Sequence, residues 1–262
     1  MRPQRIARAT LTSLAFAAAL TAAPETRAEP RSTVWLEDLN LRPPAATEAS
    51  LFYEFQAADA KAMDQGIDLL TLRLAAGVSE RLELAPMLRF RQRGSEEFRL
   101  HDLGGMLRAR IAGSAAAPRL VAYGAYFNDL GTERDHRFVA GAAGRYDAGR
   151  WFVAADLRGS AYAGGELADT RELWIGGAVG RAFLAERQLT AGLETFLIAP
   201  FGGARMSDPT FGESAESSSF YYGPNVTFRA GPFWTAASAA SGFGVSEPAS
   251  QILFRWMVGI QN

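Results

Sequence analysis

The chain has 262 residues, with 27 Lys and Arg against 28 Asp and Glu, and it contains no cysteine. The absence of cysteine excludes a disulfide framework and a thiolate metal site. Residues 1–28 hold four arginines and one glutamate, so without them 23 basic residues face 27 acidic ones, a net charge of −4. This balance offers no electrostatic basis for nucleic-acid binding.

The first residues have the pattern of an export signal. Three arginines precede a ten-residue apolar run at 14–23, and Thr26 and Ala28 are small residues at the spacing that signal peptidase needs. A helix needs about 20 apolar residues to span a bilayer, so we expect residues 1–28 to be a cleaved signal peptide. Residues 29–48 contain a Pro-Pro pair and are predicted to be an irregular periplasmic lead-in.

Residues 49–262 are predicted to form one all-β unit. Large apolar side chains recur at every second position in segments of about ten residues, as they do in strands with two unlike faces. No stretch after the signal peptide has a sustained helical period. The twelve predicted strands cover 50–57, 66–77, 81–92, 98–112, 118–127, 136–147, 151–162, 171–184, 187–200, 218–230, 232–243 and 250–261.

The connections between these segments alternate in length. Those at 78–80 and 148–150 are tight, whereas the longest, at 201–218, is rich in glycine, serine and acidic residues. This alternation is typical of a single up-and-down antiparallel barrel in an outer membrane. An even strand count places both ends of the barrel on the short-turn side, which we assign to the periplasm. The loop at 201–218 is then expected on the outer surface.

One face of the predicted strands is apolar. It carries Leu72 and Leu84, and we also assign Val121, Tyr123 and Phe127 to it. A soluble barrel would alternate in the same way, with this face inside. The membrane barrel is favoured because aromatic residues gather at the segment ends and because the chain has one lysine.

The last predicted strand closes the barrel. Phe254 and Trp256 are expected to face lipid, and Arg255 between them is expected to face the lumen. Pairing of this strand with the first one would leave no backbone edge exposed to hydrocarbon.

The second face of the strands is predicted to line the lumen. It carries nine arginines and six acids, an excess of three positive charges, and its small residues are expected to leave open space. The charged residues are Arg73, Arg89, Arg91, Arg108, Arg110, Arg145, Arg158, Arg229 and Arg255, with Glu54, Glu83, Asp102, Asp156, Glu172 and Glu194. Two interpretations stay open. The charges pair across strands and only hold the interior together, or some also form a weakly anion-favouring path, since twelve strands lie between filled and open barrels.

Three stretches resemble a known group, the outer-membrane barrels of Gram-negative bacteria typified by the MetA-pathway of phenol degradation family. They are GVSERLELAPMLRF at 77–90, LHDLGGMLRARI at 100–111 and ILFRWMVGIQ at 252–261. The resemblance implies a transporter-like barrel that takes up small organic molecules or lets them pass.

An enzymatic barrel is the competing class, because lipid hydrolysis needs a nucleophile and a histidine base. His101 and His136 are the two histidines, and neither lies in a recognisable serine–histidine motif. His101 and Asp102 are expected on opposite faces of a strand. Two histidines without cysteine also favour no transition-metal site, and no glycine-rich phosphate loop is found. We expect no enzymatic activity and no cofactor.

The sequence therefore predicts a porin-like outer-membrane protein that allows passive passage of small organic solutes and weakly favours anions. Its expected partners are membrane lipid, the solutes and the barrel-assembly machinery, and its oligomeric state is left open. A non-conducting structural barrel is the main alternative, and an outer-membrane lipid hydrolase is a further one.

Overall fold

The computed structural model describes residues 33–262 apart from 38, 58–65, 95, 114–117, 131–134, 166, 169, 185–187, 202–205, 208–213, 216–217 and 244–251. The predicted signal peptide at 1–28 lies outside the described residues. Among the residues that are described, no helix is long and apolar enough to cross a membrane.

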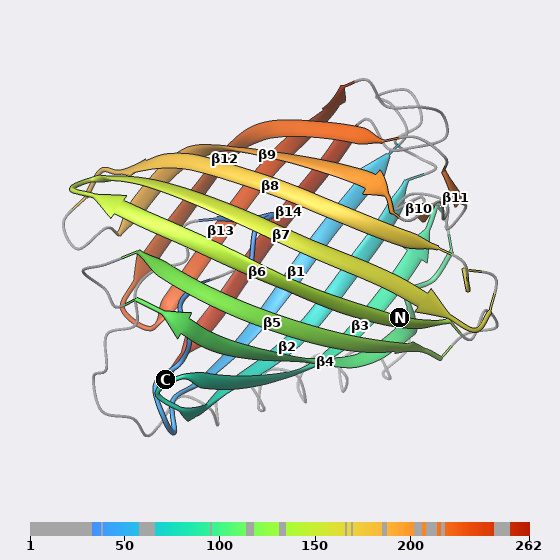
Figure 1. Cartoon of the computed structure of the whole chain (residues 1–262), viewed down its shortest axis with the longest axis horizontal. Coiled ribbons are helices and arrows are strands. Elements are labelled where there is room, and N and C mark those ends of the chain that lie inside the picture. The colour runs from blue at the N-terminus through green and yellow to red at the C-terminus, as the bar shows by residue number, and fades with distance from the viewer. Residues whose placement is uncertain are drawn as a thin grey trace, which may run out of the picture.

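Twelve antiparallel strands close into one barrel, which confirms the predicted fold class (Figure 1). The strands of the wall are β1 (Thr47–Ala57), β2 (Ile67–Ser79), β3 (Leu82–Arg93), β4 (Arg99–Ala112), β5 (Arg119–Asp129), β6 (His136–Ala148), β7 (Trp151–Ala163), β8 (Arg171–Ala182), β9 (Leu189–Pro200), β12 (Ser219–Ala230), β13 (Phe233–Phe243) and β14 (Ile252–Gln261). Two further short strands, β10 (Met206–Ser207) and β11 (Ser214–Ala215), pair with each other within the longest loop.

Neighbours in the wall follow one another along the chain, and the ring is closed by the pairing of β1 with β14. The backbone N–H of Asn262 donates to the carbonyl of Thr47 at 2.9 Å, so the start of β1 and the end of β14 lie together. The tight turns, such as those at 80–81 and 149–150, share this end of the barrel, which we call the short-turn end. The opposite rim is the long-loop end.

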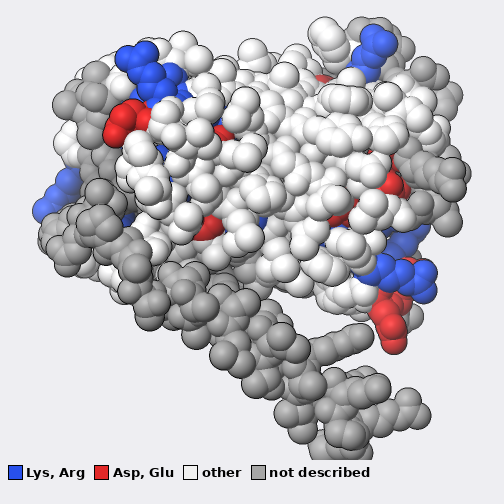
Figure 2. Space-filling view, turned by 90° about the horizontal axis from the view of Figure 1, so that it is seen from below, with Lys and Arg blue, Asp and Glu red and all other residues white. Residues whose placement is uncertain are grey.

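The outer wall of the barrel is apolar over most of its height. Leu72, Leu84, Phe254 and Trp256 are exposed, as predicted, whereas their sequence neighbours Arg73, Glu83 and Met257 are buried inside the barrel. Figure 2 shows one side of the wall as largely uncharged, with Lys, Arg, Asp and Glu gathered towards the two ends. An apolar band between polar rims matches the hydrocarbon core of a bilayer.

Strand β5 is oriented opposite to the prediction. Val121, Tyr123 and Phe127 are buried inside the barrel, and Leu120 and Tyr126 are exposed on the outer wall. Both faces of this strand are apolar, so the alternation alone did not fix which one turns inward. The inward face is apolar because it has apolar partners within the lumen.

Those partners come from residues 33–46, which we call the internal segment. The prediction for 29–48 was an irregular periplasmic lead-in. The structure shows an irregular backbone before β1, but it places this stretch inside the barrel. Val34 is 0% exposed and Trp35 2% exposed, and both pack against inward side chains of the wall.

Candidate functional site

The lumen of the barrel is divided between the internal segment and a cavity. The segment is fixed by lumen carboxylates that accept hydrogen bonds from its backbone. Glu194 accepts from the N–H groups of Val34 and Trp35 at 2.5 and 2.6 Å. Asp156 accepts from the N–H of Glu37 at 3.1 Å, and Glu83 from that of Arg42 at 2.9 Å. Three of the predicted lumen acids therefore bind the chain's own backbone.

Apolar contacts hold the same segment along its length. Trp35 packs against Phe196 of β9, and its indole N–H donates to Ser238 of β13 at 2.9 Å. Leu36 lies so close to Gly176 that a β-carbon there would be 2.3 Å from a methyl group of the leucine. The small residues of the inner wall thus make room for the segment. The expectation that they leave open space was wrong at Gly176.

A buried network of charges joins the segment to the short-turn end. Glu83 and Arg108 are both fully buried, and their side chains form an ion pair. Arg73 donates to the same carboxylate at 2.9 Å, and Arg108 also contacts Glu37 at 3.2 Å. Arg42 pairs with Glu48 at the start of β1. Buried charges are tolerated when they are paired in this way, so these arginines hold structure together.

The remaining predicted charges of this half lie near its rim. Arg145 donates to Asp147 at 2.9 and 2.7 Å and stacks over Phe152. Arg229 donates to the carbonyl of Gly231 at 3.0 Å in the turn after β12. Arg110 has its Nε atom buried without a hydrogen-bond partner among the described residues.

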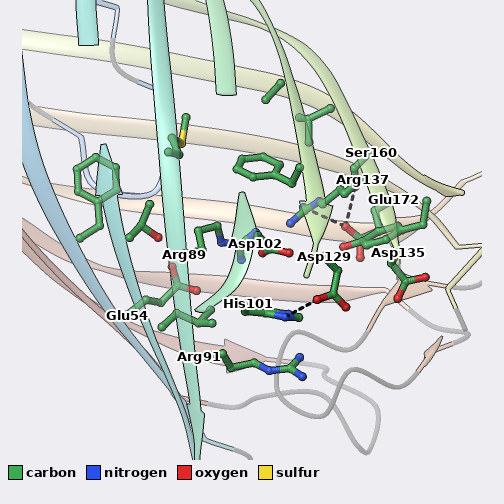
Figure 3. A pocket seen from close by; sticks show the side chains of 18 of the residues that line it. Glu54, Arg89, Arg91, His101, Asp102, Asp129, Asp135, Arg137, Ser160 and Glu172 are labelled. Atoms are coloured by element: carbon green, nitrogen blue, oxygen red, sulfur yellow. Dashed lines mark hydrogen bonds and ion pairs between the residues drawn. The ribbon is translucent and has the colours of Figure 1, made fainter. Parts of the chain in front are cut away.

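A cavity of about 290 Å³ occupies the half of the lumen nearer the long-loop end (Figure 3). Five arginines and five carboxylates of the described residues line it, so its formal charge sums to zero apart from one histidine. They are Arg89, Arg91, Arg137, Arg158 and Arg255, with Glu54, Asp102, Asp129, Asp135 and Glu172. The predicted excess of three positive charges is therefore not concentrated at the cavity.

Six of these cavity charges form ion pairs between strands, and the pair of Arg137 with Glu172 reaches across β7, which lies between β6 and β8. Arg89 lies 3.0 Å from Asp102, and Arg137 lies 3.6 Å from Glu172. Arg255 of β14 pairs with Glu54 of β1 across the seam that closes the barrel. Ser160 donates to Glu172 at 2.8 Å. Figure 3 shows Arg89, Asp102, Arg137 and Glu172 pointing into the same space from separate strands.

The bulge in β4 changes the position of His101. The register of β3 and β4 shifts between Arg89 and Phe90, so Arg89 is opposite Asp102 and Phe90 is opposite Leu100. A bulge inserts one extra residue and redirects the side chains next to it. His101 and Asp102 consequently both line the cavity, and the prediction that they lie on opposite faces was wrong.

His101 contacts Asp129 of β5, with 3.1 Å between its Nδ1 and the carboxylate. Ligand atoms of His101, Asp102 and Asp129 all lie within 4.8 Å of one another, so these are described residues that could hold a cation. However, Arg89 already neutralises Asp102 at 3.0 Å. His136 lies 2.8 Å from the hydroxyl of Tyr126, and in the described part of the chain neither histidine is hydrogen-bonded to a serine.

The sequence matches no protein-family profile and no curated protein. Solved structures do resemble the barrel. An outer membrane channel from Pseudomonas putida F1 has a TM-score of 0.60 at 13% identity, covering 92% of this chain and 100% of that one. A NanC porin has a TM-score of 0.54 at 9% identity, with 82% of this chain and 98% of that one covered. A KdgM porin in complex with disordered oligogalacturonate has a TM-score of 0.52 at 12% identity, over 82% and 97% of the two chains.

These likenesses show the fold: the chain has the architecture of porin-like outer-membrane barrels. At such low identity the likeness is one of strand arrangement. The resemblance to the MetA-pathway of phenol degradation family, drawn from three short stretches, stays a prediction.

Sequence reasoning missed the residues of the internal segment. Glu37, Asn40 and Arg42 all contact lumen charges, and Arg119 at the start of β5 donates to the Asn40 side chain at 2.7 Å. A signal was present in VWLEDLNL at 34–41, which has five large apolar residues in eight. Such a stretch is costly to leave in water and indicates a buried partner.

Proposed function

We propose that the protein is an outer-membrane channel that lets small organic solutes diffuse through its lumen, with a weak preference for anions. The observation that carries the passage of solutes is the 290 Å³ cavity inside the closed wall at the long-loop end. The preference for anions rests on Arg158, which lines the cavity and has no ion pair within the described residues, and not on the net charge of the lining. Three solved barrels of the same fold are described as porins or as an outer membrane channel. The apolar outer wall supports a place in the membrane.

The internal segment has a defined role in this proposal. Its contacts lie with the short-turn halves of β3, β7 and β9, between the cavity and the periplasmic opening that we assign to that end. A solute that enters the cavity can cross the membrane only when this segment shifts from its place. The segment therefore sets how often the path is open.

The test is permeation by the full-length protein. Protein reconstituted into planar bilayers should pass current with a reversal potential biased towards anions, and liposomes containing it should take up small organic acids. Membranes that stay ion-tight at every voltage, with liposomes equally impermeable, would leave the structural barrel as the better description. Mass spectrometry of the membrane fraction should find the mature chain beginning near Glu29. Protein that retains Met1 would contradict export through a cleaved signal.

A further inference from the structure

The luminal cavity contains one arginine whose environment differs from that of its paired neighbours. Arg158 of β7 lies with its guanidinium carbon 4.0 Å from the ring centroid of Trp174 on β8. It forms no hydrogen bond and no ion pair with a residue that the structure describes, whereas Arg89, Arg137 and Arg255 each pair with a carboxylate. Arg158 nevertheless lines the cavity.

The carboxylate two residues earlier on the same face of β7 is bound to other partners. Asp156 accepts a hydrogen bond from the hydroxyl of Tyr123 at 2.6 Å and another from the backbone N–H of Glu37 at 3.1 Å. The carboxylate has acceptor sites beyond these two donors, but it forms no hydrogen bond and no ion pair with Arg158, so the guanidinium of Arg158 points elsewhere.

The indole ring of Trp174, on which Arg158 stacks, is itself packed against further aromatic rings. Trp174 stacks on Phe196 with an interplanar angle of 8° and a centroid distance of 5.4 Å, and Phe196 stacks on Tyr221 at 4.9 Å. Phe196 and Tyr221 are buried. Trp174 therefore has a fixed orientation, and the guanidinium on its face is confined with it.

Gly141 of β6 leaves room for Arg158 on the side away from Trp174. A β-carbon at Gly141 would lie 2.7 Å from the β-carbon of Arg158 and 2.6 Å from the hydroxyl of Tyr123. The side chains of Arg158 and Tyr123 therefore approach each other across a strand that has no side chain there. Any side chain at position 141 would overlap with both of them, so the glycine leaves the space that Arg158 and Tyr123 occupy.

We propose that Arg158, stacked on Trp174, binds the carboxylate of a small solute that has an apolar body. A guanidinium stacked on an aromatic face keeps its N–H edge available, and that edge matches a carboxylate with two parallel hydrogen bonds. Phe127, Tyr123 and Met106 line the same cavity and can cover the apolar part of the solute. A volume of about 290 Å³ is at the lower limit for ligand pockets, which suits a small molecule.

This inference rests on the proposed passage of small solutes and names their class. Its test is a binding measurement that requires no permeation. Full-length protein in detergent is titrated calorimetrically with benzoate, with acetate as the carboxylate without an apolar body, and with phenol as the uncharged ring. Benzoate should bind more tightly than either of the other two.

Arg158→Gln should weaken benzoate binding by roughly tenfold or more, because a charge-assisted bidentate contact is lost. Arg158→Lys should recover part of the affinity, since it restores the charge but not the planar fork. Phenol binding should not change in either variant. Arg181→Gln is the matched control, because Arg181 also lies over an indole, that of Trp151 at 5.5 Å, but is exposed on the outer wall. Its benzoate affinity should equal that of the wild type.

Equal benzoate affinity in wild type and Arg158→Gln would overturn the proposal, provided that both proteins are folded, as shown by a shift in gel mobility on heating. Acetate binding as tight as benzoate would overturn the assignment of an apolar body. Benzoate flux into liposomes separates the two proposals. Benzoate binding that depends on Arg158, without benzoate flux, would support this binding site and contradict the proposed passage of solutes. Benzoate flux without binding that depends on Arg158 would support passage and contradict this binding site.

Discussion

Glu194 of β9 holds Trp35, a residue 159 positions earlier in the chain, by accepting a hydrogen bond from its backbone N–H at 2.6 Å. The same carboxylate accepts the N–H of Val34 and the side-chain amide of Asn225. An ionised carboxylate accepts hydrogen bonds and donates none, and it has acceptor sites for all three of these donors. This one side chain therefore fixes the innermost part of the internal segment.

Replacement of that carboxylate should release the segment. In Glu194→Gln the new amide presents an N–H₂ group to backbone donors, and each lost hydrogen bond to a charged group is worth about 1.5–3 kcal/mol. We expect the amides around Val34 to exchange roughly 10- to 150-fold faster, as measured by hydrogen exchange and mass spectrometry. Glu172→Gln is the control, since Glu172 lines the cavity and accepts from Ser160 instead. Unchanged exchange in Glu194→Gln would contradict this anchor.

Two adjacent glycines of β8 lie on opposite faces of the barrel wall. Gly176→Val places its side chain against Leu36, because even a β-carbon there would be 2.3 Å from that leucine. Overpacking typically costs 1–3 kcal/mol, so the segment should be displaced and single-channel conductance should rise. Gly177→Val points to the outer side, where a β-carbon would meet its nearest atom at 3.7 Å. That variant should conduct like the wild type. A rise in single-channel conductance in both variants would show that the internal segment does not limit the conductance.

Glu83 should contribute more to stability than Glu54. Glu83→Gln leaves Arg73 and Arg108 buried with their shared carboxylate removed, and breaking a buried pair in this way costs about 3–5 kcal/mol. Glu54→Gln breaks a pair with Arg255 that is partly open to the cavity, so the loss should be smaller. Urea unfolding from lipid vesicles measures both. Equal midpoints for the two variants would show that burial of the Glu83 network is not what stabilises the short-turn end.

The direction of the side chains on β2 is tested by a charge on each face. Leu72→Arg puts a cation on the outer wall, where a position near the bilayer midplane costs about 2–4 kcal/mol. Thr71→Arg is the neighbour in sequence, but its side chain lines the cavity. Folding yield into vesicles should fall for Leu72→Arg and change less for Thr71→Arg. The reverse order would mean that the outer wall does not face lipid.

The strands could be predicted from sequence because the two faces of most of them differ. In β14, the exposed Phe254 and Trp256 alternate with the inward Leu253, Arg255 and Met257, and this alternation alone sets the faces. It failed on β5, where Val121 and Leu120 are both large and apolar. There the choice depends on the internal segment, whose Leu39 and Leu41 pack against Val121.

The site was harder to predict than the wall, for two physical reasons. The bulge that turns His101 inward adds one residue to β4, and no glycine or proline marks that place in the sequence. Arg158 and Arg137 look equivalent along their strands, since each is an arginine on an inward position. Only the arrangement in space shows that Arg137 pairs with Glu172 while Arg158 stacks on an indole.

The internal segment also has a consequence for the order of folding. Its hydrogen bonds to Glu83, Asp156 and Glu194 connect residues 41, 119 and 159 positions apart, and each carboxylate is on a different strand. Contacts of such long sequence separation form late, after β3, β7 and β9 have been brought together. Interactions absent from the transition state change the rate of unfolding and leave the rate of folding nearly untouched. We therefore expect the segment to bind after these three strands have come together, and its contacts to slow unfolding more than they speed folding.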